Sequence, residues 1–301
     1  MIFNNFDQLI DQVRSKNHAI KTVAVVAAED SHTLEAISHS TKNGFVKALL
    51  VGDRQKITEQ LSKMDERPSD YTIVHADNAA AAAYTAAQLV NEGQAQFLMK
   101  GLIETPTLMK ILFNKECGFR TGSLISHICF VKIPNYHKLI GITDVALNIY
   151  PNFEQKKAIL ENAVRTMTRM GFDTPKVAVL AANEHVNPKM PETVDAAELK
   201  KMNSEGTISG CIIEGPISYD LTLSKEAADI KRFNSPVPGD VDLLLVPNIA
   251  AGNILVKALV YSAEANRAGI VIGAKVPIVL SSRAAAAEDK YLPLVLAASA
   301  S

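Results

Sequence analysis

The feature that most constrains the fold of this chain is an alternation of short apolar runs with longer stretches of helical period. Runs such as Thr22–Ala27 and Lys47–Val51 have the length and composition of buried strands, and segments with apolar residues at helical spacing separate them. Repeated strand–helix–strand units feed a parallel sheet with helices on both faces, so the pattern predicts an α/β fold. The other expected elements of this part are strands Thr72–His75 and Phe97–Lys100, and helices after an N-cap at Ser31, near Asp53–Met64 and over Asn78–Asn91.

A change of pattern near residue 130 predicts a second domain. Two apolar runs, Ile128–Ile133 and Lys138–Thr143, are joined by Pro134–His137, which is typical of a hairpin and not of a helical crossover. The α/β alternation then resumes with helix Asn152–Met170 and strand Lys176–Ala181, and a length of 301 residues also favours two domains. We therefore expect two doubly wound α/β domains with a cleft between them, one formed by residues 1–133 plus 281–301 and the other by residues 134–280.

The overall charge argues against two classes of partner. There are 31 Lys and Arg against 32 Asp and Glu, so the formal net charge is -1 and no strong field attracts nucleic acid or an anionic membrane. No run of about eighteen apolar residues occurs, and Asp7 and Asp11 interrupt the region where a signal peptide would need an apolar core. We expect a cytoplasmic protein with neither nucleic-acid nor membrane partners.

The three cysteines, Cys117, Cys129 and Cys211, are an odd number at wide spacing, with no C-x-x-C motif and no cluster of histidines beside them. This spacing supports neither a disulfide framework nor a zinc site, and we expect no bound metal. Cys129 and Cys211 lie in apolar runs and are interpreted as small core residues; Cys117 is left open. Nucleotide-binding glycine motifs and a G-x-S-x-G nucleophile motif are also absent from the sequence.

Ser282 and Arg283 are the most suggestive candidates for an anion site. They follow the apolar run Val276–Leu280 and precede a helical stretch expected over Ala284–Ala298. A hydroxyl, a planar guanidinium and the free N–H groups of a helix start would suit phosphate, sulfate or carboxylate. The alternative is an N-cap serine beside a solvated arginine. Asp289 lies two helical turns after Ser282 and could act as a general base, or it could belong to a hydrated surface.

Several motifs, taken in order, resemble the phosphate acetyl/butyryltransferase family, and its phosphate butyryltransferase branch most closely. The likeness covers about two thirds of the chain. Its segments include LMKG at Leu98–Gly101, FRTGSLISH at Phe119–His127, AGNILVKALVY at Ala251–Tyr261 and IGAKVPIVLSSRA at Ile272–Ala284.

The resemblance implies transfer of a short acyl group, butyryl being favoured, between coenzyme A and inorganic phosphate. It implies a plan like that of isocitrate and isopropylmalate dehydrogenases, a homodimer or larger homo-oligomer, and coenzyme A as substrate with no permanently bound cofactor. Ser282 and Arg283 would hold the phosphate and the polarised carbonyl, with Asp289 as the base. Further residues expected at the substrates are Arg120, Ser126, Asn253 and Lys257.

The sequence departs from the family pattern at two places. Ala285 and Ala286 stand where butyryl-type members carry an acid and a hydroxyl, and Tyr261 stands where acetyl-type members carry an arginine. Two alternatives follow: a catalytically weakened paralogue that binds coenzyme A or another metabolite, and a decarboxylating hydroxy-acid dehydrogenase of similar fold. The dehydrogenase would need aspartates converging on a divalent ion, and no D-x-x-x-D set supports it.

Overall fold

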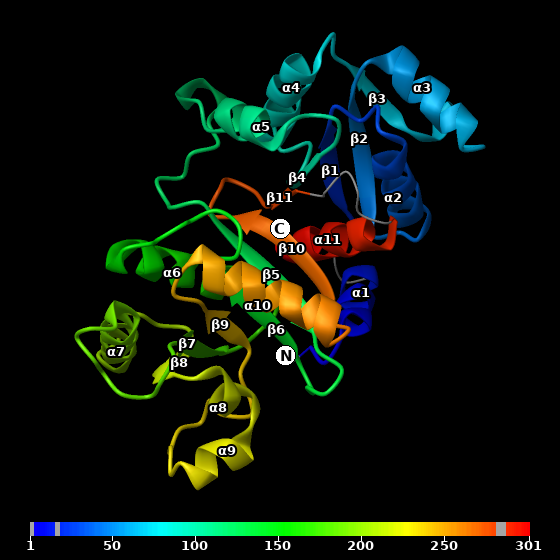
Figure 1. The fold of residues 1–301 in the computed structure, drawn as a ribbon. Helices are drawn as coiled ribbons and strands as arrows, with labels where there is room; N and C mark the ends of the chain where they lie inside the picture. The colour runs from blue at the N-terminus through cyan, green and yellow to red at the C-terminus, as the bar shows by residue number, and fades with distance from the viewer. Residues whose placement is uncertain (1–2, 16–18, 281–286) are drawn as a thin grey trace. The chain divides into compact units, whose positions relative to one another are not determined.

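The computed structural model describes residues 3–15, 19–280 and 287–301, with side chains left out at 287–290. The chain forms two compact units. We call residues 7–123 and 268–301 the N-terminal unit, and residues 1–6 and 124–267 the central unit. Each unit is an α/β assembly of strands and helices, which confirms the predicted α/β class (Figure 1).

The boundaries of the units differ from the expected division at residues 134 and 281, because pairing holds both strands of the hairpin together. Strand β5 (Ser126–Lys132) pairs antiparallel with β6 (Leu139–Thr143), so the division falls before β5. The start of the chain joins the same unit, since Phe3 accepts a backbone hydrogen bond from Leu139 at 2.8 Å and its ring lies 5.2 Å from that of Phe172.

In the N-terminal unit the strands follow the order β3-β2-β1-β4-β11-β10. The first five are mutually parallel and β10 is antiparallel to β11. The strands are β1 (Lys21–Val26), β2 (Val46–Gly52), β3 (Thr72–His75), β4 (Phe97–Lys100), β10 (Asn266–Ile272) and β11 (Ile278–Val279). The helices are α1 (Phe6–Arg14), α2 (Ser31–Lys42), α3 (Arg54–Lys63), α4 (Ala79–Asn91), α5 (Thr105–Leu112) and α11 (Ala287–Ser299), with short 3₁₀ turns at Pro68–Asp70 and Lys115–Cys117.

In the central unit the strand order is β5-β6-β9-β7-β8. All neighbours except the β5–β6 hairpin are parallel, so β6, β7, β8 and β9 end at the same edge of the sheet. The remaining strands are β7 (Lys176–Leu180), β8 (Ile212–Ile217) and β9 (Leu243–Leu245). The helices are α6 (Phe153–Arg169), α7 (Pro191–Ser204), α8 (Tyr219–Leu223), α9 (Lys225–Ile230) and α10 (Ile249–Ser262).

Short polar side chains at the starts of helices fix several element boundaries. Asn152 caps α6 by accepting from the N–H of Gln155, whose side chain accepts from the N–H of Asn152 in return. The cap of α2 is Asp30, which accepts from the N–H of Thr33, and the predicted N-cap Ser31 is the first helical residue instead. Both residues are common N-caps, and the helix begins one residue earlier than predicted because Asp30, not Ser31, accepts the hydrogen bond from the first turn.

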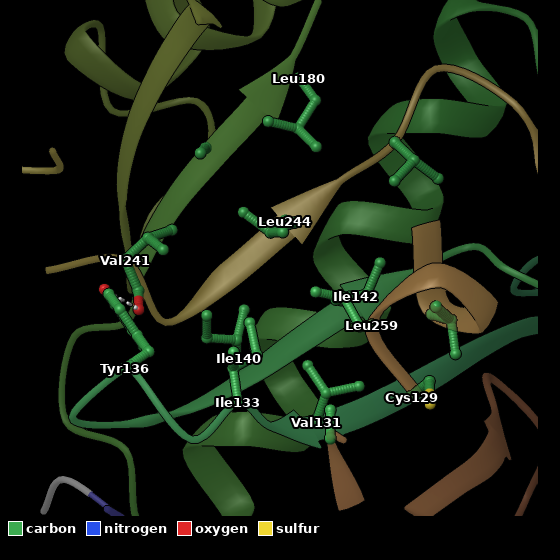
Figure 2. Packing of buried hydrophobic residues seen from close by; sticks show 14 of the residues in the cluster. Cys129, Val131, Ile133, Tyr136, Ile140, Ile142, Leu180, Val241, Leu244 and Leu259 are labelled. Carbon is green, nitrogen blue, oxygen red and sulfur yellow. Dashed lines mark hydrogen bonds between the residues drawn. The ribbon is translucent and has the colours of Figure 1, made fainter. Parts of the chain in front are cut away.

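The core of the central unit lies between β5, β6, β7 and β9 and the inner face of α10 (Figure 2). Cys129 and Val131 of β5, and Ile133 directly after it, alternate toward this core, and Leu259 joins the same cluster from α10. Tyr136, in the turn between β5 and β6, places its ring in the same cluster and donates a hydrogen bond from its hydroxyl to the carbonyl of Val241 at 3.1 Å. The alternation puts one face of β5 into this core and leaves Ser126, Ile128 and Phe130 on the other face.

Among the described residues, no helix combines the length and the apolar character that crossing a membrane would require.

Candidate functional site

Ligands of open α/β sheets bind outside the carboxyl ends of the parallel strands, so the loops at this edge are where a site is expected. In the central unit, Asp144 directly follows β6 and is 2% exposed. Its carboxylate accepts from the N–H groups of Ala146 and Leu147, at 2.8 and 3.0 Å, and from the side chain of Asn148. Asp144 therefore holds the shape of the loop that follows β6.

The start of α10 packs directly on that loop. Asn253, one of the predicted substrate residues, donates from its side-chain amide to the carbonyl of Val145 at 3.2 Å. Gly252 lies so close that a Cβ there would come within 2.7 Å of the Val246 side chain and 3.1 Å of the Asp144 carbonyl oxygen. The glycine–asparagine pair thus fixes α10 against the Asp144 loop, a structural role that local sequence alone left open.

A cluster of polar groups follows β7 and β8 at the same edge. The Ser218 hydroxyl lies between the carboxylates of Glu184 and Asp220, and Lys231 approaches each of these at 3.2 Å. Burial opposes ionisation of Glu184, but hydrogen bonds from Ser218 and Lys231 outweigh it and lower the pKa of Glu184. For Asp220, its share of the single proton of the Ser218 hydroxyl lowers the pKa, and Lys231 lowers it further. Sequence reasoning missed this cluster; the available signal was that Glu184 and Ser218 closely follow the ends of two adjacent parallel strands.

At the carboxyl edge of the N-terminal unit, β11 runs parallel to β4, with Val279 paired to Met99. Lys100 is the last residue of β4 and Gly101 follows it. A Cβ on Gly101 would lie 2.3 Å from the carbonyl oxygen of Ala27, so this close approach of two strand ends requires glycine. The predicted residues Ser282 and Arg283, and the departures Ala285 and Ala286, lie outside the described residues. Asp289 falls in the first turn of α11, where only the backbone is described.

Arg120 lies at a hollow of about 630 Å³ in the N-terminal unit. Its Nε donates to the carbonyl of Phe113 at 2.6 Å, which leaves the terminal nitrogens of the guanidinium for other partners. Lys110 and Thr107, from α5, and Tyr84, from α4, line the same hollow, and Tyr84 is 45% exposed. Two cations, a hydroxyl and an exposed ring together suit a ligand that combines phosphate groups with a flat base.

Ser126 and Lys257 have very different surroundings in the central unit. Ser126 is fully buried, and its hydroxyl accepts from the amide of Asn162 at 3.2 Å. Lys257 is exposed on α10 one turn after Asn253, and it has no ion pair with any residue that the structure describes. The structure thus ties Ser126 to α6 and leaves the Lys257 ammonium in solvent.

The three thiols are poor nucleophiles in these surroundings. Cys129 and Cys211 are buried, as predicted, and burial raises their pKa to about 12 and about 11. Cys117, left open by the sequence, is also buried, and burial raises its pKa. Because the thiolate is the reactive form, none of the three is activated for covalent catalysis.

Comparison with known proteins gives the chain its family. The profile described as "Phosphate acetyl/butaryl transferase" matches residues 67–298. The chain is 40% identical over 297 residues to a phosphate butyryltransferase of Clostridium acetobutylicum, covering 99% of this chain and 98% of the relative. It is also 40% identical over 292 residues to a phosphate acetyltransferase of Thermotoga maritima, covering 97% and 98%. The chain therefore belongs to the phosphate acetyl/butaryl transferase family, as the resemblance of its motifs indicated.

Solved structures agree with this assignment. A branched-chain phosphotransacylase of Enterococcus faecalis is 33% identical, with a TM-score of 0.83 over 93% of this chain and 99% of that one. A phosphotransacetylase of Streptococcus pyogenes, 20% identical, has a TM-score of 0.84 over 98% of each chain and shows a likeness of fold alone. A 4-hydroxythreonine-4-phosphate dehydrogenase of Klebsiella pneumoniae is 12% identical, with a TM-score of 0.61 over 93% of this chain and 98% of that one, and shares the fold alone.

Proposed function

We propose that the protein transfers a short-chain acyl group, butyryl foremost, between coenzyme A and inorganic phosphate to give an acyl phosphate. The observation that carries this proposal is the likeness to phosphate butyryltransferases over 99% of the chain, together with the family match. Coenzyme A acts as a substrate, and no cofactor stays bound. Homodimers or larger homo-oligomers, a cytoplasmic location and a plan like that of isocitrate dehydrogenases belong to the same proposal.

In this proposal Arg283 binds the reacting phosphate and Ser282 donates to the charge that develops on the tetrahedral oxygen or the departing thiolate. Asp289 takes the thiol proton of coenzyme A when acyl-coenzyme A forms, and phosphate leaves the acyl carbon as the new carbon–sulfur bond is made. The chain order supports these roles, since β11 ends at the edge where β4 delivers Lys100 and Gly101, and α11 begins at Ala287.

For coenzyme A, we assign the phosphate groups to the hollow lined by Lys110 and Arg120. Arg120 is held by Phe113 and can still offer its terminal nitrogens, while the exposed ring of Tyr84 offers a face on which an adenine could stack. Asn253 and Lys257 are proposed as contacts from α10; the amide of Asn253 would act mainly by holding the Asp144 loop. Ser126, being buried, would act through the position of β5.

The test measures phosphate-dependent release of free thiol from acyl-coenzyme A substrates of two to six carbons. We expect turnover with a maximum of kcat/KM near butyryl-coenzyme A. Because a positioned base contributes about 10²–10⁴ in rate, Asp289→Asn should lower kcat by about that factor, whereas its neighbour Glu288→Gln serves as the matched control. Binding of coenzyme A without thiol release would identify the weakened paralogue instead.

Arg283→Gln tests the phosphate site separately. Loss of charge-assisted hydrogen bonds from the guanidinium should raise the KM for phosphate by about tenfold or more. An unchanged KM and an unchanged kcat would remove Arg283 from the proposal while leaving the transfer reaction itself in place.

A further inference from the structure

A second hollow, outside the loops described above, carries an unassigned cluster of hydrogen-bond donors. It has a volume of about 440 Å³ and lies between the last two turns of α6 and the loop before β8. Arg165 and Arg169 line it from α6, and Thr207 and Ser209 line it from the loop. All four side chains belong to the central unit and are exposed.

The loop side of this hollow offers unused donors. Within the described chain, the hydroxyls of Thr207 and Ser209 make no hydrogen bond, and neither do the N–H groups of Ser209 and Gly210. Gly210 has a φ of +78°, and a Cβ there would lie 3.8 Å from a methyl group of Val164 on α6. A left-handed glycine thus turns the loop back onto α6 and keeps these donors beside the two arginines.

The two guanidiniums are not used in ion pairs. Neither Arg165 nor Arg169 has a carboxylate within salt-bridge distance in the part of the chain that the structure describes. The acid that lines the hollow, Glu161, has Lys157 at 4.0 Å. The hollow therefore carries a net positive charge next to neutral donors.

A hydrogen bond to a buried residue of α6 holds the Arg165 side chain in place. One of its terminal nitrogens donates to the side-chain oxygen of Asn162 at 3.2 Å. Asn162 is buried, and its amide nitrogen donates to the carbonyl of Leu124 at 2.6 Å and to the Ser126 hydroxyl at 3.2 Å. A guanidinium anchored on one side loses less side-chain entropy when a ligand binds to the other side.

Stabilisation of the negative end of α6 would explain why a cation stands at Arg169 but not why one stands at Arg165. Cations in the last turn of a helix balance its negative end, and Arg169 is the last residue of α6. Arg165 lies one turn earlier, where that effect has faded. Balancing the helix end therefore leaves the position of Arg165 unexplained.

We propose that this hollow binds the phosphate group of a small molecule, at a place separate from the transferase site. Two forked cations with hydroxyl and N–H donors are the set that recognises a dianionic oxyanion. The loop precedes β8, so the hollow lies at the amino ends of the parallel strands, whereas Asp144 and Ser218 follow their carboxyl ends. The site does not depend on the proposed acyl transfer.

The test is hydrogen exchange of the full-length protein titrated with inorganic phosphate. We expect phosphate to slow exchange in peptides covering residues 205–211 and 164–170. In the double variant Arg165→Gln/Arg169→Gln, the phosphate concentration for half protection should rise by about tenfold or more. The matched control is Lys189→Gln/Lys225→Gln, which removes two charges from exposed lysines of the same unit that do not line the hollow, and it should behave as wild type.

Three outcomes would overturn the proposal: no protection of these peptides by phosphate, equal protection in the arginine variant, or protection by coenzyme A and not by phosphate. The last would place the hollow in the coenzyme site. If the arginine variant fails to fold, Thr207→Val/Ser209→Ala makes the same test from the loop side and should also weaken protection. If the wild-type protein shows no acyl transfer but phosphate still slows exchange in these peptides, the result counts against the proposed function and not against this site.

Discussion

At the scale of single residues, a charged cluster at the amino ends of β6, β7 and β9 shows how distant positions share one electrostatic environment. Lys138 is 3% exposed at its side chain, and its ammonium lies 2.6 Å from Asp240 and 3.1 Å from Asp242. Lys176 and His137 also contact Asp240. Burial disfavours the ionised carboxyl of Asp240, but hydrogen bonds from its three partners prevail and lower its pKa from 3.8 to about 2.

Asp240→Asn should lower the free energy of unfolding by about 1–2 kcal/mol at pH 7; a larger loss is not expected because water screens the partly exposed carboxyl. Since the folded pKa lies below the unfolded one, the stabilisation is present above about pH 4 and is lost as the pH falls toward about 2. Urea unfolding at pH 7, 5 and 3 measures this as a wild-type-to-variant difference that shrinks at pH 3.

The control for this prediction is Asp229→Asn, which removes the carboxyl of an exposed pair with Lys225 on α9. Exposed pairs contribute little, so this change should have a small effect at every pH. A difference between wild type and Asp240→Asn that stays the same at pH 3 and pH 7 would refute the linkage.

At the scale of elements, helical period and buried runs predicted most helices and strands. Strands Thr72–His75 and Phe97–Lys100 have the predicted bounds, and the helix expected over Asn152–Met170 is α6 with its two caps. Sequence analysis assigned no element to α1 or α5, which are nine and eight residues long. Short helices give a weak periodic signal because only two or three positions define the buried face.

The capping box of α6 gives a prediction at this scale. Asn152→Ala removes the acceptor for the Gln155 N–H and should cost about 0.5–2 kcal/mol, whereas Asn152→Gly should cost only a few tenths of a kcal/mol. Urea unfolding of both variants measures the difference. If the alanine and glycine variants lost the same free energy of unfolding, the expected preference for glycine over alanine at an N-cap would be contradicted.

At the scale of the whole molecule, the chain consists of two units, and the N-terminal unit contains strands from distant parts of the sequence. The N-terminal unit gathers residues 7–123 and 268–301, so β11 and α11 join strands that precede them by more than half the chain. Helix α11 packs on α2 and on β11, and residues Leu294–Leu296 are fully buried. Each unit therefore buries its own core.

Cavity-forming substitutions should then act mainly on the unit that contains them. Leu244→Ala in the central unit and Leu50→Ala in the N-terminal unit each truncate a fully buried leucine and should cost about 2–5 kcal/mol. Hydrogen exchange of each variant should speed up first in its own unit, because most contacts of each leucine lie there. Uniform acceleration across both units in either variant would contradict this expectation.

The sequence by itself determined the α/β class, the hairpin over residues 128–143, the burial of Cys129 and Cys211 and, through ordered motifs, the family. These follow from local period, composition and motif order, which need no knowledge of distant neighbours. The tertiary structure alone decided that Asn253 holds the Asp144 loop, that Ser126 is buried against Asn162, and that Glu184, Ser218, Asp220 and Lys231 meet at one edge. The physical reason is that parallel pairing brings strand ends together whatever their separation in the chain, so which side chains share a site depends on register and crossover geometry that no local pattern contains.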